Sequence, residues 1–149
     1  MALYSPRASG LGNSAAYQVA GKPYMTGSTV EAFAFGAEEI KIEFPTVAKK
    51  LYFQHTGSQG TILRISLDST AEDSGLNRVN NGNHFFLLYP ASTSGSGEVK
   101  LEGKFKEIYV SNIFSGGSAY PQSGFHLYAE LTGIPSSEMY ELTGSGINI

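Results

Sequence analysis

Apolar and polar side chains alternate along several short segments of this chain, and such alternation is typical of half-buried β-strands. The clearest segment is GFHLYAELT, residues 124–132, in which Phe, Leu, Ala and Leu share one face while His, Tyr, Glu and Thr share the other. Pro135 follows it. Because proline has no N–H to donate to a strand ladder, we expect this strand to end there.

Other segments show the same period of two, separated by glycine-rich or polar turns. The predicted strands are 30–35, 39–44, 49–57, 61–69, 84–90, 98–103, 104–114 and 124–132. Pro45 is expected to end the second of them. Within 61–69, Leu63, Ile65 and Leu67 should face inward, with the intervening residues outward. This spacing favours an all-β fold, an antiparallel β-sandwich or jelly roll of about eight strands.

Two of these segments depart from simple alternation. HFFLLYP, residues 84–90, carries Phe and Leu on both faces, which predicts a central strand that is covered on each side. In 104–114 the apolar Phe105 is at an odd position, whereas Ile108 and Val110 are at even ones. A β-bulge or a fresh strand start would absorb this phase slip.

Residues 1–28 lack a sustained period and carry few charges, so we interpret them as an extended N-terminal arm in front of a β-sandwich domain, residues 29–149. A tail without a role is the simpler alternative. However, the arm holds more apolar residues than a solvated tail usually does. We therefore expect it to lie on a neighbouring subunit, with Tyr17, Val19, Pro23 and Tyr24 as its contact residues.

Composition narrows the class of protein further. The 149 residues include 18 Gly, nine Tyr and nine Phe, with no Cys and no Trp, so stability must come from packing or assembly rather than disulfides. The net charge of −3 disfavours a broad basic surface for nucleic acid. No apolar run approaches the roughly 20 residues of a membrane helix. We therefore expect neither nucleic acid nor membrane as a partner.

Candidate chemistry is weak throughout the chain. GLGNSA, residues 10–15, imitates a dinucleotide-binding loop but lacks the strand before it and the helix after it. His55, His84 and His126 are far apart and have no carboxylate cluster beside them. A Ser-His-acid set stays open because serines are many, yet no Gly-x-Ser-x-Gly elbow occurs. We expect no enzyme, no cofactor and no metal site.

Four segments of the chain carry a resemblance to a known family: NSAAYQVAGKPYMTGS, IKIEFPTVAKKLYF, AELTGIP and the C-terminal LTGSGINI. In this layout the chain resembles small virion structural proteins of tailed bacteriophages, in particular head-associated decoration or fibre-like proteins of marine phages. The resemblance implies a β-sandwich or jelly roll that forms homotrimers and binds the major capsid protein at the capsid surface of the virion. It carries no ligand motif, so no functional residue follows from it.

A second hypothesis is a carbohydrate- or receptor-binding module of a virion fibre. Aromatic rings can stack on the apolar faces of sugars, and the candidates are Tyr52, Tyr109, Tyr128 and Tyr140. If these tyrosines gather in one groove, the sugar-binding hypothesis gains support; if they pack at subunit contacts, they serve assembly. A cellular β-sandwich adaptor is a third hypothesis, without a motif in its favour.

Overall fold

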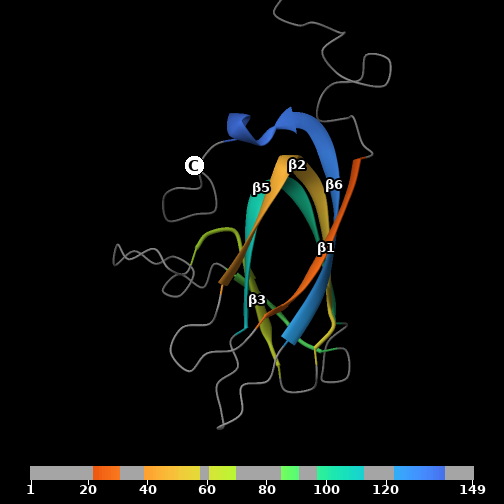
Figure 1. Cartoon of the computed structure of the whole chain (residues 1–149), viewed down its shortest axis with the longest axis vertical. Coiled ribbons are helices and arrows are strands. Elements are labelled where there is room, and N and C mark those ends of the chain that lie inside the picture. The colour runs from red at the N-terminus through yellow and green to blue at the C-terminus, as the bar shows by residue number, and fades with distance from the viewer. Residues whose placement is uncertain are drawn as a thin grey trace, which may run out of the picture.

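The computed structural model describes residues 22–30, 39–57, 61–69, 85–90, 97–112 and 123–139, which form a single antiparallel sheet (Figure 1). Its six strands are β1 (Lys22–Val30), β2 (Glu39–His55), β3 (Leu63–Ser66), β4 (Phe85–Leu88), β5 (Glu98–Asn112) and β6 (Ser123–Pro135). The spatial order is β1-β6-β2-β5-β3-β4. A short 3₁₀ turn, η1 (Ser136–Glu138), follows β6. The all-β prediction is confirmed for these ranges, which contain no α-helix.

The two predicted strands on either side of Pro45 are one long strand, β2, so the prediction that Pro45 ends a strand was wrong. The register of β2 with β5 shifts between Glu43 and Ala48, and again between Ala48 and Lys50. Pro45 therefore lies in an irregular stretch. There the missing N–H removes no regular ladder bond.

Segments 98–103 and 104–114 likewise belong to one strand, β5, as far as Asn112. Phe105, Ile108 and Val110 are all buried, although their positions differ in phase. The register of β5 with β2 shifts between Phe105 and Glu107, at the predicted phase slip, as a β-bulge or a similar irregularity would make it.

The alternation predicted for 124–132 is also confirmed. Phe125, Leu127, Ala129 and Leu131 are buried, and β6 ends at Pro135. Thr132 belongs to the opposite face but is buried too, and its hydroxyl donates to the Val47 carbonyl at 2.7 Å. It sits where β6 passes the irregular stretch of β2.

The inner face of the sheet carries the hydrophobic core. It is built from the apolar side chains of β2, β3, β5 and β6, among them Leu51, Phe53 and Leu63, and from Leu88 of β4. The sheet curls around this core: Tyr24 of β1 and Phe44 of β2 touch edge-to-face, with ring centroids 5.4 Å apart, although β6 separates the two strands. Figure 1 shows the long strands arching toward η1.

Two details of the inner face differ from the alternation expected for β3 and β4. Ser66, expected outward, is buried with its hydroxyl donating to the Asp68 carbonyl, and Leu67 is only half-buried. The apolar run 84–90 was predicted as a central strand, which was wrong: β4 is at the edge of the described sheet. Phe86 and Leu87 are exposed at this edge, whereas Leu88 is buried.

The sequence did not predict β1. Lys22–Val30 includes the last part of the predicted arm and pairs along its whole length with β6. Proline and an interior glycine obscure its strand pattern, and an edge position tolerates both. Of the expected arm contacts, Tyr24 is half-buried against Phe44 and Pro23 is exposed. Tyr17 and Val19 lie outside the described residues, so their contact with another subunit stays a prediction.

Candidate interaction surface

The exposed large apolar side chains of the described residues lie on the two edge strands, β1 and β4, and on β6 beside β1. Met25 is 76% exposed and Tyr128 37% exposed, and the two are register partners across β1 and β6. Phe86 is 50% exposed and Leu87 38% exposed, both in β4. Isolated exposed apolar residues are ordinary, but a concentration at both edges marks these edges as candidate contact surfaces.

Among the described residues, the β1 edge lacks the usual protection of an edge strand. Natural sheets block their edges with charged residues, prolines, bulges or covering segments. After Lys22, β1 contains no charged residue, and its one proline, Pro23, is close to the start of the strand. The seven residues from Tyr24 to Val30 can therefore offer backbone groups to another strand.

The β4 edge is apolar on both faces. Phe86 is the register partner of buried Ile65, and Leu87 is the register partner of Arg64. The Arg64 guanidinium lies 5.7 Å from the Phe85 ring centroid and donates from Nε to Ser111 Oγ at 3.1 Å. Burial lowers the pKa of Arg64, while Glu39 partly opposes this shift. The Arg64 side chain is therefore fixed on the outer face, next to Phe85 of β4.

The tyrosines proposed for sugar binding do not form a common groove. Tyr52 and Tyr128 are register partners on the outer face. The Tyr52 hydroxyl, however, donates to Glu98, which raises its pKa, and the Lys100 ammonium lies 5.6 Å from the ring centroid. Tyr109 is at a different place on β5, and Tyr140 lies outside the described residues.

Tyr109 instead belongs to a small ionic cluster. Its hydroxyl donates to Glu107 at 3.0 Å, and Lys41 bridges Glu43 and Glu107 at 2.8 and 2.9 Å. Burial and then the bond to Glu107 raise the pKa of Tyr109 to about 12. Lys41 lowers the pKa of Glu43. Because Lys41 favours the charged form of Glu43, this carboxylate is poorly suited to act as a general acid.

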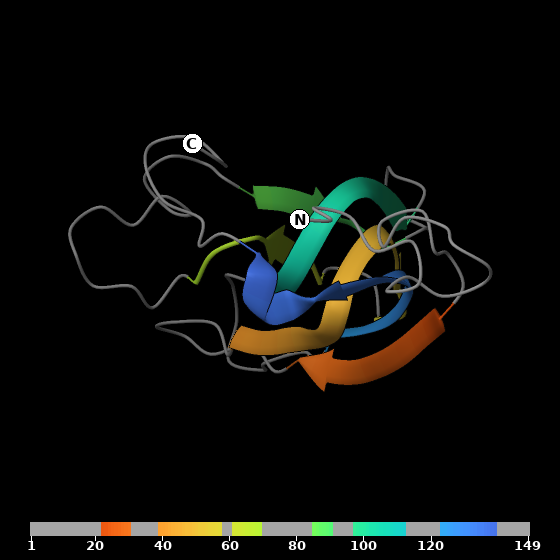
Figure 2. The ribbon, with the colours of Figure 1, turned by 90° about the horizontal axis from the view of Figure 1, so that it is seen from above.

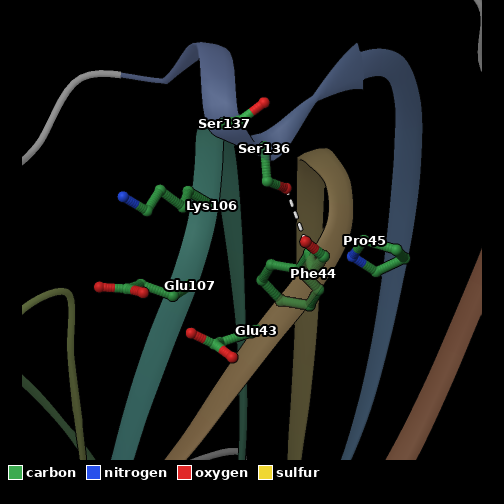
Figure 3. Close-up of a pocket in the computed structure, with 7 residues that line it drawn as sticks. All are labelled: Glu43, Phe44, Pro45, Lys106, Glu107, Ser136 and Ser137. Carbon is green, nitrogen blue, oxygen red and sulfur yellow. Dashed lines mark hydrogen bonds between the residues drawn. The ribbon is translucent and has the colours of Figure 1, made fainter.

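A pocket of about 410 Å³ lies where the irregular stretch of β2 meets β5 and η1. Figure 3 shows the Ser136 hydroxyl pointing at the Phe44 carbonyl, to which it donates at 2.6 Å, while Glu43, Lys106 and Glu107 extend to one side. No tyrosine lines this pocket. Its serine secures η1 to β2, so the contact is structural.

A buried polar cluster closes the other end of β2. The Gly57 N–H donates to His55 Nδ1 at 3.0 Å, while His55 Nε2 lies 3.0 Å from Ser123 Oγ and 3.3 Å from Thr61 Oγ1. Burial lowers the pKa of His55, and a hydrogen bond with the Thr61 backbone partly opposes this shift. Since Nδ1 accepts a bond, neutral His55 carries its proton on Nε2.

This tautomer decides what the serine-histidine pair can do. A nucleophilic serine needs an unprotonated ring nitrogen that takes its proton. Here the nitrogen that faces Ser123 is the donor. The pair therefore stabilises the fold rather than activating the serine. It could not be predicted from the sequence because 68 positions separate the two residues.

The remaining chemical expectations concern metals and membranes. His55 is buried, whereas His126 is exposed, and His84 lies outside the described residues. Within the ranges that the structure covers, no three histidine or acidic side chains gather as a metal ion would require. Within the same ranges, the structure contains no helix with the length and hydropathy that a membrane crossing requires.

Comparison with known proteins adds no relative. No protein-family model, no curated protein sequence and no solved structure matches this chain.

Proposed function

We propose that this chain is a self-assembling structural protein of a phage virion, which forms homotrimers on the capsid surface and binds the major capsid protein. The observation that carries the self-assembly is the placement of the exposed apolar side chains: Met25 on edge strand β1 with Tyr128 beside it on β6, and Phe86 and Leu87 on edge strand β4. Open edges of this kind pair readily with another strand.

The capsid location rests on the sequence segments that resemble virion proteins of tailed phages. The proposal includes the finer fold that this resemblance implies, a sandwich or jelly roll of about eight strands. The curl of the sheet supports it, because Tyr24 and Phe44 touch although β6 lies between their strands.

Two measurements test the proposal. Light scattering of the full chain at micromolar concentration should give the mass of three 15.9 kDa subunits, and a monomer would overturn the assembly. Mass spectrometry of purified particles of the source phage should find its peptides at a constant ratio to the major capsid protein. Their absence from intact particles would overturn the virion assignment.

The second candidate function is the carbohydrate- or receptor-binding module. In its favour, Tyr52, Tyr128 and Met25 lie in one row across neighbouring strands on the outer face. A glycan array should then show binding that Tyr128→Ala abolishes. An array without signal removes this function, because no other group of described tyrosines lies together on one face.

A further inference from the structure

The two edge strands of the described sheet lie on opposite sides of it. Figure 2 shows β1 and β4 at opposite borders of the ribbon, with β6, β2, β5 and β3 between them. Among the described strands, β1 pairs with β6 alone and β4 with β3 alone. One subunit can therefore contact two different neighbours at once, one at each edge.

The directions of the strands fit such contacts. All five neighbouring pairs are antiparallel, so direction alternates along the six-strand order and β1 runs opposite to β4. If a second copy is generated by rotation about an axis parallel to the strands, each strand keeps its direction. β4 of one subunit can then lie beside β1 of the next in an antiparallel pair, which is the commoner arrangement in sheets.

The side chains at the two edges also match face to face. Met25 is the register partner of Tyr128, which alternates with buried Leu127 and Ala129, so both lie on the outer face. Leu87 is the register partner of Arg64 and lies on that outer face too. Phe86, beside Ile65, is on the inner face, the side on which Tyr24 packs.

We propose that copies of this chain join head to tail, with β1 of one subunit adding to β4 of the next, so that three copies close into a ring. This inference rests on the proposed self-assembly and specifies its interface. Met25 and Leu87 meet on the outer face, and Phe86 is covered from the inner side. Pairing of β1 with a second β1 would leave Phe86 and Leu87 exposed in every copy, whereas a closed ring leaves no edge open.

The absence of cysteine permits a direct test. We would introduce Met25→Cys and Leu87→Cys together and add a short bis-maleimide cross-linker. The double variant should yield covalent dimers and trimers in denaturing gels, while either single variant should stay monomeric under the same conditions. A dimer from Met25→Cys alone would indicate a symmetric β1–β1 contact and overturn the head-to-tail arrangement.

The matched control combines Met25→Cys with Gln54→Cys, because Gln54 is exposed on central strand β2. This pair should not cross-link between subunits. If light scattering gives an oligomer but the edge pair cross-links no better than this control, the head-to-tail inference falls and the proposed assembly stands. If the unmodified chain is a monomer, both fall.

A charge at the edge provides a second readout. Met25→Lys should weaken trimer formation at least about tenfold, because a desolvated ammonium in the new strand pair has no partner. Met25 is already 76% exposed in the single chain, so the fold of the monomer should not change. Unaltered trimer mass across a dilution series of Met25→Lys would contradict the proposed role of β1.

Discussion

His55 should make the stability of this fold fall as the solution becomes acidic. Its ring is buried, its Nδ1 accepts the Gly57 N–H, and its Nε2 faces two hydroxyl oxygens. Burial lowers its pKa in the folded state below the value of about 6.5 in an unfolded chain. Protonation would bury a charge and break the bond from Gly57.

The sign and size of the effect follow from proton linkage. Above about pH 6.5 the ring is neutral in both states and contributes its full stability. Below that pH the unfolded chain binds a proton that the folded chain does not, so stability falls by about 1.4 kcal/mol per pH unit until the folded pKa is reached. Between about pH 7.5 and pH 5 the loss approaches roughly 2 kcal/mol if His55 stays neutral throughout.

Urea unfolding followed by far-UV circular dichroism measures this loss, because the chain has no tryptophan for fluorescence. The protein concentration must be held constant, since assembly contributes to the apparent stability. Carboxylates also titrate in this range, so the informative quantity is the difference between the wild type and His55→Gln, whose amide does not titrate. His126→Gln, at an exposed histidine, is the matched control.

The wild type and the control should lose stability in parallel, and His55→Gln should lose less over the same interval, by up to about 2 kcal/mol. If all three lose the same amount, the ring is not held neutral in the folded chain. The argument that burial disfavours the charged His55 ring would then be wrong.

Further predictions concern the core, the turn η1 and the arm. Phe53→Ala should cost about 3–5 kcal/mol of unfolding free energy in urea, because the ring is fully buried, whereas exposed Gln54→Ala should change little. Ser136→Ala should cost about 0.5–1.5 kcal/mol through the lost bond to Phe44, and a similar loss in exposed Ser137→Ala would argue against that cause. Removing residues 1–21 keeps β1 intact. It should lower the average mass that light scattering reports at a fixed concentration, because fewer trimers form, and should leave the thermal midpoint of the monomer unchanged. An unchanged trimer mass would refute the arm contact.

Several features of the fold could be predicted because they depend on neighbouring residues only. The period of two in β6 shows which side chains face the core, whatever strand lies beside it. The phase slip around Phe105 indicated a bulge for the same reason. Pro45 misled because the effect of a proline depends on the ladder of its strand, and β2 has an irregular register at this position.

The candidate surface could not be predicted from the pattern of HFFLLYP. An apolar run on both faces is typical of a central strand and equally of an edge that another chain covers. Only the strand order places Phe86 and Leu87 at the border of the sheet. Met25 counted only as an apolar residue of the arm, because Pro23 and Gly27 obscure the strand pattern of β1.

The sequence by itself determined that the chain forms β-strands, which residues of the regular strands face the core, and that disulfides are absent. These properties follow from local alternation and composition. The tertiary structure decided which strands are neighbours, that β1 closes one edge and β4 the other, and that His55 meets Ser123. Such pairings join residues that are far apart in the chain. They depend on the register and curl of the whole sheet, which a short segment of sequence does not predict.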